Sequence, residues 1–362
     1  MNFSTLFLIL IVALFLTYFS IDIFVFKKKD RKSERRNNLI NYLLAIGFAL
    51  LMLLFIITMP AVIFLQNLVD TIMAFCILAL VTTGIVLIFK TSITTNFAQG
   101  MIATVAAYVS GKLAISFTGS MGLSQTLIVF LTMIVGAFVS FLMGIFIDVV
   151  VIRHSKNVTP IGKQMITMGL VLVISGLIPI VFGTNLINAP VFSDEVKTFN
   201  IAGYDLFITM NTIYTVIITA VVLGLLFTAL KFTKWGLGVR ATASNEVVAG
   251  IMGVNTKMIT AFSWGIAGAL GGLAAVIYAP TYGNLTSALL IPTQVNGFMA
   301  AILGGFTSFT GSILGSFLIP LMGKMFSFYN SKWQDVIVYL FILFIVLIKP
   351  LGLFGKKIAK KV

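Results

Sequence analysis

Apolar runs about 20 residues long, separated by short polar segments, are the feature that most limits what this chain can fold into. A helix needs about 20 consecutive apolar residues to cross the hydrocarbon core of a bilayer. Runs of this kind lie near 2–26, 39–59, 70–89, 98–117, 124–147, 164–182, 209–230, 259–279 and 334–348. A glycine-rich stretch also fills 296–323. The short alternating strands of an outer-membrane barrel are absent. The sequence therefore predicts an all-α, polytopic transmembrane helical bundle of about 9–10 spans.

The composition agrees with this class. Hydrophobic residues make up 59% of the chain and charged residues only 9%, whereas soluble domains carry roughly a quarter charged residues. The single cysteine, Cys76, and the single histidine, His154, form neither a disulfide framework nor a metal site within the chain. We therefore expect no metal and no redox chemistry.

The net charge of +14 comes from cations in the segments between apolar runs and near the C-terminus. The densest basic segment is 27–36. Cytoplasmic loops of membrane proteins carry such an excess of Lys and Arg, which also faces anionic lipid. The placement favours a membrane-topology signal over nucleic-acid binding. It puts 27–38 and 231–258 inside, the acidic loop 183–208 outside, and the N-terminus outside.

The stretch 296–323 tests this orientation. If it crosses the membrane once, the basic C-terminus falls outside. If it enters and returns as two short helices broken between Gly304-Gly305 and Gly311, the C-terminus falls inside. Non-helical backbone at membrane depth is tolerated only against protein or a water-filled path. We therefore expect a broken or re-entrant helix pair near 296–323 that packs against protein or lines a water-filled path. The C-terminus would then be cytoplasmic.

The predicted membrane interior lacks charge. No charged residue lies between Met258 and Gly323, although ion-coupled carriers usually keep ionisable groups inside the membrane. An ion-coupled secondary carrier is thus disfavoured, and an energy source on a cytoplasmic partner is favoured. The chain has no HExxH motif and no Gly-rich phosphate loop, so we expect no catalytic residue. An intramembrane enzyme or a structural scaffold is the weaker alternative.

The segment 231–258 alternates small, apolar and polar residues at helical spacing between Gly238 and Gly253. This pattern predicts a short helix that lies along the membrane surface. Its small residues would let it seat in a groove on a partner domain. A plain amphipathic loop helix is the alternative interpretation.

Four segments carry a resemblance to a known family. Arg240–Lys257 is followed by the glycine- and alanine-rich Gly265–Gly283; the other three are Thr95–Gly100, Ala300–Gly311 and Lys349–Gly355. In this order they resemble the permeases of branched-chain amino acid ABC importers. Thr307 stands where those proteins usually have a third glycine. The match runs from about Gln66 to Gly355.

The resemblance implies how the chain is divided. Residues 1–60 would be an added N-terminal pair of spans with a basic cytoplasmic loop. Residues 61–355 would be the ABC importer permease domain, and 356–362 a basic cytoplasmic tail. The protein would lie in the bacterial cell membrane as a multi-pass subunit.

The resemblance also implies partners. These are a second permease, identical or merely homologous, two ATP-binding subunits that hold the ATP and Mg, and an external or periplasmic solute-binding protein. The chain itself would hold no cofactor. Its substrate would be a branched-chain or related amino acid. Urea and short amides are alternatives on similar permeases, and nucleosides or sugars are alternatives on more distant ones.

Two groups of candidate site residues follow. By resemblance, the loop that couples to the ATPase would use Arg240, Asn245, Glu246, Ala249, Gly250 and Gly253. Uncharged polar residues near predicted helix breaks are candidates for the translocation path: Thr94, Thr95, Asn96, Gln99, Thr293, Gln294 and Asn296. The alternative for the second group is that these side chains only satisfy broken backbone or bond neighbouring helices. The pairs Gly268/Gly272 and Gly311/Gly315 are spaced for close helix packing, which we expect within the subunit.

Overall fold

The computed structural model describes residues 31–355, except 121, 156–157 and 202. Within this part of the chain, 7 helices are long and apolar enough to cross a membrane. They are α3 (Ala61–Ser92), α4 (Gln99–Ser120), α5 (Gln125–Phe146) extended by the π-helix η1 (Ile147–Ile152), α6 (Pro160–Phe182), α7 (Met210–Phe232), α10 (Thr256–Tyr278) extended by η2 (Ala279–Tyr282), and α12 (Phe309–Ser327). The predicted all-α membrane bundle is confirmed. The span expected at 2–26 lies outside the described residues.

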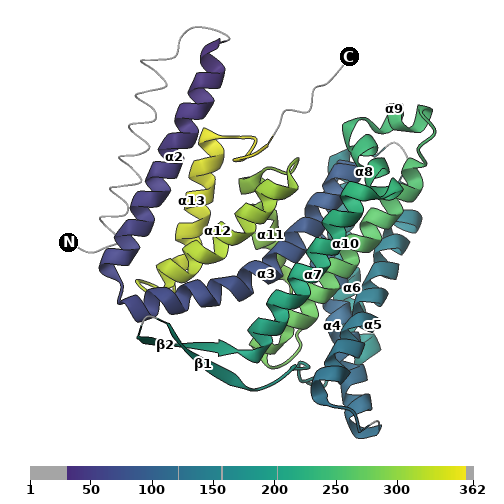
Figure 1. Cartoon of the computed structure of the whole chain (residues 1–362). Helices are drawn as coiled ribbons and strands as arrows, with labels where there is room; N and C mark the ends of the chain where they lie inside the picture. The colour runs from purple at the N-terminus through teal and green to yellow at the C-terminus, as the bar shows by residue number, and fades with distance from the viewer. Residues whose placement is uncertain (1–30, 121, 156–157, 202, 356–362) are drawn as a thin grey trace.

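The remaining helices are shorter or only partly apolar. They are α2 (Arg31–Thr58), α8 (Lys234–Ser244), α9 (Glu246–Ile251), α11 (Ile291–Gly304) and α13 (Gln334–Ile348). Figure 1 shows α8 and α9 at one end of the bundle and a small β-hairpin at the other. We call these the α9 end and the hairpin end.

Charge differs between the two ends. The described cations that flank helix termini at the α9 end are Lys90, Arg153, Lys163, Lys231, Lys234, Arg240, Lys257 and Lys349. The hairpin end carries Asp70, Asp194, Glu195, Asp205 and Asp335 beside Lys112, Lys197, Lys324 and Lys332. The α9 end is therefore the more basic one, and most of the described acidic residues lie at the hairpin end.

The hairpin itself was not predicted. Strands β1 (Val196–Ile201) and β2 (Tyr204–Thr209) pair antiparallel, with Val196 opposite Thr209 and Ile201 opposite Tyr204. The side-chain amide of Gln66 in α3 holds β2, because its Nε2 donates to the Phe207 carbonyl at 2.9 Å and its Oε1 accepts from the Phe207 amide at 3.0 Å. A segment expected to be a loop is thus a paired hairpin, and a side-chain amide of α3 ties it to the bundle.

Glycines bring α10 against α5 and α4 at backbone distance. A Cβ added at Gly268 would collide with the Ser140 carbonyl, and one at Gly272 would lie 3.0 Å from both Ala106 Cβ and Ser140 Oγ. The Ser140 hydroxyl donates to the Ile102 carbonyl at 2.9 Å. Small residues allow such close approach, which replaces the hydrophobic drive that helices lack in lipid. The expected packing of Gly268 and Gly272 within the subunit is confirmed.

A second glycine seam joins α11 to α12. Gly304 and Gly311 lie backbone against backbone, and Gly315 contacts the carbonyl of Ala300. The chain reverses at 305–308, where Gly305 has φ +98°. The break is therefore at the predicted place. The expectation of two short helices was wrong for α12, which has 19 residues and is long enough to span the membrane, whereas α11 has only 14 residues.

The C-terminal segment 349–355 closes over this turn. The amides of Leu353 and Phe354 donate to the carbonyls of Leu303 and Gly304 at 2.8 and 3.1 Å, which satisfies groups that a helix end leaves unpaired. Lys349 Nζ donates to the Leu353 carbonyl at 3.1 Å, and burial lowers the pKa of this ammonium below its ordinary value. Two of the resembling segments, 300–311 and 349–355, thus form one structural unit.

Candidate functional site

The connection from α3 to α4 leaves the α9 end and runs into the bundle. Residues 93–98 are not helical, and α4 begins only at Gln99. Gln99 Nε2 donates to the carbonyls of Val81 and Ala267 at 3.3 and 3.4 Å. Val81 lies about 16 Å along α3 from Ser92 at 1.5 Å per residue, close to half the thickness of the hydrocarbon core. The start of α4 is therefore near mid-membrane depth.

A second non-helical segment, 283–290, approaches from the hairpin end. Near that end the Leu285 amide donates to the Ile187 carbonyl at 2.9 Å, and the Tyr108 hydroxyl reaches the Leu285 carbonyl at 3.4 Å. Five residues later the chain is beside Gly100, since a Cβ there would lie 3.2 Å from the Leu290 carbonyl. Tyr108 and Gly100 are about 12 Å apart along α4. Helix α11 thus also begins near mid-depth.

Helices α4 and α11 leave this meeting point in opposite directions. The C-terminal end of α4 leads into α5. The side chains of Gln125 and Thr126, at the start of α5, donate to the carbonyls of Val191 and Phe192 near the hairpin end. The turn after α11 lies beside the end of α3, where the rings of Phe89 and Phe306 are 4.7 Å apart. Two helix N-termini therefore face each other inside the bundle. We call this meeting point of 93–100 and 290–294 the mid-membrane junction.

Gln294 fastens the junction. Its Oε1 accepts from the Gly100 amide, and its Nε2 donates to the Phe97 carbonyl at 2.7 Å. The side chain is 6% exposed. One amide therefore satisfies both a donor at the start of α4 and an acceptor in the non-helical segment, which would otherwise be buried without partners.

The other predicted path residues gather at or near the junction. Thr94, Thr95, Asn96, Gln99 and Thr293 are buried. Asn96 Oδ1 accepts from the Ala98 amide at 2.9 Å and so caps the approach to α4. Asn296 is half-buried and accepts from the Tyr339 hydroxyl at 2.8 Å instead.

The polar groups at the junction differ in whether they already have hydrogen-bond partners. Asn96 and Gln294 satisfy backbone, which is the alternative that the sequence left open for this group. Among the described residues, Gln99 Oε1 and the hydroxyls of Thr82 and Thr83 are buried polar atoms without a hydrogen-bond partner. The junction is uncharged and polar, and it offers amide and hydroxyl groups rather than ionisable ones. No group of His, Cys, Asp and Glu able to hold a metal exists within the described part of the chain.

The α9 end carries the predicted coupling loop. Asn245 separates α8 from α9, and its Oδ1 accepts from the amides of Val247 and Val248 at 3.0 and 3.1 Å. This is an N-cap, which satisfies donors at a helix start. Arg240 donates to the Leu230 carbonyl near the end of α7. Both residues therefore hold the loop in shape.

The exposed face of α9 is apolar. Val247, Ile251 and Met252 are 72%, 79% and 78% exposed, and Val248 is exposed as well. Of the predicted coupling residues, Glu246, Gly250 and Gly253 lie on the exposed side, but Ala249 is buried and points into the loop. Gly253 has φ +87° and turns the chain toward α10. The predicted coupling residues in this segment were small or polar. The residues that the structure exposes most are instead apolar, namely Val247, Val248 and Ile251 of α9 and Met252 directly after it.

Seven long apolar helices in the described part of the chain make this a multi-pass membrane protein of the helical type. A family model described as branched-chain amino acid transport system, permease component, matches residues 67–347. The chain belongs to this family. The stretch 1–60 lies outside that match.

Individual relatives agree. The chain is 22% identical over 301 residues to the high-affinity branched-chain amino acid transport system permease protein LivH of Escherichia coli K12, covering 83% of this chain and 98% of LivH. It is 24% identical over 291 residues to the probable branched-chain amino acid transport permease protein LivH of Methanocaldococcus jannaschii, covering 77% and 89%. The solved structure of PsaBC from Streptococcus pneumoniae in complex with Fab covers 81% of this chain and 94% of that chain at 15% identity, with a TM-score of 0.39.

Proposed function

We propose that this chain is the membrane-spanning subunit of an ATP-driven importer of branched-chain or related amino acids. It works beside a second permease, two ATP-binding subunits dock on it, and an external binding protein delivers the solute. The observation that carries the proposal is the family match over 67–347 together with the exposed apolar helix at the basic end.

The basic end is the cytoplasmic end in this proposal. The excess of Lys and Arg follows the positive-inside rule, and ATP-binding subunits need a cytoplasmic surface. The acidic hairpin end then faces outward, where a binding protein would approach. The described C-terminal segment 349–355 then lies on the cytoplasmic side.

Helix α9 is the contact for an ATP-binding subunit. Val247 and Ile251 of α9, and Met252 directly after it, are more than two-thirds exposed, whereas Ala249 is buried. Large exposed apolar side chains rimmed by polar residues are typical of interaction sites. Glu246 is the first residue of α9 and is exposed beside them, and it would supply part of the polar rim.

The family match supports the substrate class, and the uncharged interior is compatible with it. A zwitterionic amino acid has no net charge, so a path lined by amide and hydroxyl groups suffices once each end of the solute is hydrogen-bonded. Half-helix N-termini near the midplane are a recurrent place for a solute carboxylate. Selectivity among apolar side chains would then rest with the external binding protein.

Uptake by the complex tests the proposal. The chain, its partner permease, the ATP-binding subunits and the binding protein are placed in liposomes and offered labelled leucine, valine, urea, a nucleoside and a sugar. We expect leucine and valine uptake that needs both ATP and the binding protein. Entry of another solute alone would overturn the substrate. Uptake by the chain without ATP-binding subunits would overturn the importer and favour an ion-coupled carrier.

A further inference from the structure

Asp148 is a buried carboxylate in the last turn of a membrane span. It is 4% exposed, and it lies in η1, where the Arg153 amide donates to the Asp148 carbonyl five residues earlier at 2.9 Å. Short π-helical segments are rare and are often found at functional sites. An ionisable residue within a span is costly unless it is paired, and it marks a functional site more often than a structural one.

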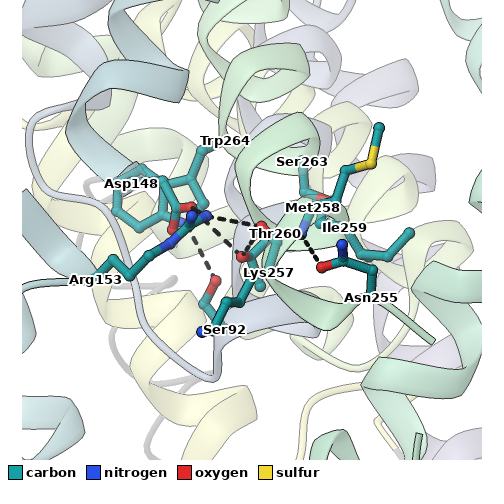
Figure 2. Close-up of polar contacts among 10 residues, drawn as sticks. All are labelled: Ser92, Asp148, Arg153, Asn255, Lys257, Met258, Ile259, Thr260, Ser263 and Trp264. Carbon is teal, nitrogen blue, oxygen red and sulfur yellow. Dashed lines mark hydrogen bonds and ion pairs between the residues drawn. The ribbon is translucent and has the colours of Figure 1, made fainter. Parts of the chain in front are cut away.

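The carboxylate is paired with a residue of the same π-helical end and tied to α10. Arg153 Nη2 lies 3.1 Å from Asp148 Oδ2 and also donates to the Lys257 carbonyl at 2.8 Å. The Thr260 hydroxyl lies 3.4 Å from the same Asp148 oxygen and 3.0 Å from the Lys257 carbonyl. Figure 2 shows these groups converging on the first turn of α10. We call Asp148, Arg153 and Thr260 the latch.

The first turn of α10 is also where the α9 loop ends. Only 252–255 separate the two helices, and Asn255 caps α10 by accepting from the Met258 amide at 3.1 Å. The amides of Met252 and Val254 donate to the carbonyls of Val248 and Ala249 at 3.0 Å each, so this short connection is hydrogen-bonded back to α9. The turn that the latch holds to α5 is therefore close to α9 along the chain.

One turn further along α10, a second contact leads to the mid-membrane junction. Trp264 is 1% exposed, and its Nε1 donates to the Ser92 hydroxyl at 3.0 Å (Figure 2). Ser92 is the last residue of α3 and the point where the chain turns down into 93–98. Movement of α10 is thus passed to the segment that leads to Gln99 and Gly100.

We propose that the latch and the Trp264–Ser92 hydrogen bond are the positioning contacts that transmit movement of α9 to the mid-membrane junction. The inference rests on the proposed function, since it needs an ATP-binding subunit to move α9. The latch fixes the orientation of α10 against α5. The hydrogen bond from Trp264 to Ser92 then couples the position of α10 to the start of the non-helical segment 93–98. None of these residues touches the solute; they set how many solute molecules enter for each ATP hydrolysed.

The test compares uptake and ATP hydrolysis in the same reconstituted complex. Asp148→Asn keeps the shape and removes the charge, and Arg153→Gln removes the partner. Thr260→Val, Trp264→Phe and Ser92→Ala each remove one hydrogen-bonding group and little volume, so they fold even if a charge variant does not. Asp70→Asn is the matched control, because Asp70 pairs with Lys324 at 3.7 Å near the hairpin end, with both side chains about 40% exposed.

We expect each variant of the latch and of the Trp264–Ser92 pair to lower leucine uptake per ATP hydrolysed, by about tenfold for Asp148→Asn. Asp148→Asn combined with Arg153→Gln will be no worse than either alone, because the two act as a unit. Arg153→Lys restores part of the ratio. The control leaves it unchanged, as exposed ion pairs contribute little.

A merely structural role gives a different result. Uptake and hydrolysis would then fall together, in proportion to the amount of assembled complex, and their ratio would stay constant. That result, or an unchanged ratio in Trp264→Phe and Ser92→Ala, overturns the inference. Failure of the wild-type complex to take up any solute with ATP would overturn the proposed function instead, so the two failures are distinguishable.

Discussion

Two of the resembling segments, 95–100 and 240–257, lie at the mid-membrane junction and around helix α9, and these two regions differ in what their side chains contact. At the junction, Gln294 and Asn96 bond backbone amides and carbonyls, and the residues are buried. At α9, the polar residue Asn245 bonds backbone too, but the apolar side chains of Val247 and Ile251 contact nothing in this chain that buries them.

The difference teaches how to separate residues that build the permease from residues that serve a partner. A buried polar group that satisfies backbone stabilises the subunit whether or not a complex forms. An exposed apolar side chain adds almost nothing to the subunit alone and acts only when a partner covers it. Substitutions at the junction should therefore affect folding, and substitutions on α9 should affect assembly.

The largest expected effect on stability is at the α11–α12 seam that supports the junction. Gly304→Val places a side chain into the backbone of Gly311, so we expect a loss of more than about 3 kcal/mol in the free energy of unfolding. Denaturant titration of the purified chain in detergent measures it. Gly176→Val on α6 is the matched control: nothing lies within 4 Å of that position, and the change should stay within about 0.5 kcal/mol. Equal losses of stability in Gly304→Val and Gly176→Val would contradict close backbone packing between α11 and α12.

Gln294→Leu is the next largest. It keeps the approximate size of the side chain and leaves the Gly100 amide and the Phe97 carbonyl buried without partners. We expect a loss of about 2–3 kcal/mol by the same titration. Asn296→Leu removes the hydrogen bond between half-buried Asn296 and exposed Tyr339 and should cost about 1 kcal/mol or less. If the two variants are equally stable, Gln294 does not fasten the junction.

Asn245→Ala should cost about 1 kcal/mol, because it removes the N-cap of α9. The loss is local, so hydrogen exchange at the amides of Val247 and Val248 should speed up while α10 stays protected. Asn245→Asp keeps an accepting oxygen and should retain most of the protection. Unchanged exchange in Asn245→Ala would show that the cap does not order α9.

The smallest effect on stability is at Ile251, which is 79% exposed. Ile251→Asp should change the free energy of unfolding by no more than about 0.5 kcal/mol. The same substitution should reduce co-purification of an ATP-binding subunit, whereas Ile251→Leu should not. If Ile251→Asp is stable and still co-purifies normally with an ATP-binding subunit, then the exposed face of α9 is not a contact for that subunit.

Much of the fold could be predicted because apolar length and charge placement are strong signals in a membrane protein. The break at Gly304–Gly305 was also foreseen, because glycines at that spacing permit a reversal that other residues resist. The packing of Gly268 and Gly272 followed from the same reasoning. Each of these depends on residues near each other in sequence.

The parts that were missed depend on distant contacts. That 93–98 runs to mid-depth is set by Gln99 reaching Val81 and Ala267, which no local pattern reveals. The hairpin 196–209 is anchored by Gln66, which lies in another helix. The pairing of Asp148 depends on a π-helical turn that brings Arg153 back to it, and the sequence does not reveal that turn. The exposure of Val247 and Ile251 on α9 could not be predicted either, because apolar side chains in a membrane protein are normally buried or face lipid.

A photo-reactive amino acid placed at position 251 tests the central claim most directly, namely that an ATP-binding subunit docks on α9. Position 180 on α6 serves as the comparison, because Ile180 is 78% exposed on a membrane helix. In a complex that hydrolyses ATP and imports leucine, we predict a crosslink to an ATP-binding subunit from position 251 and none from position 180. A functioning complex with no crosslink from position 251 would contradict the account.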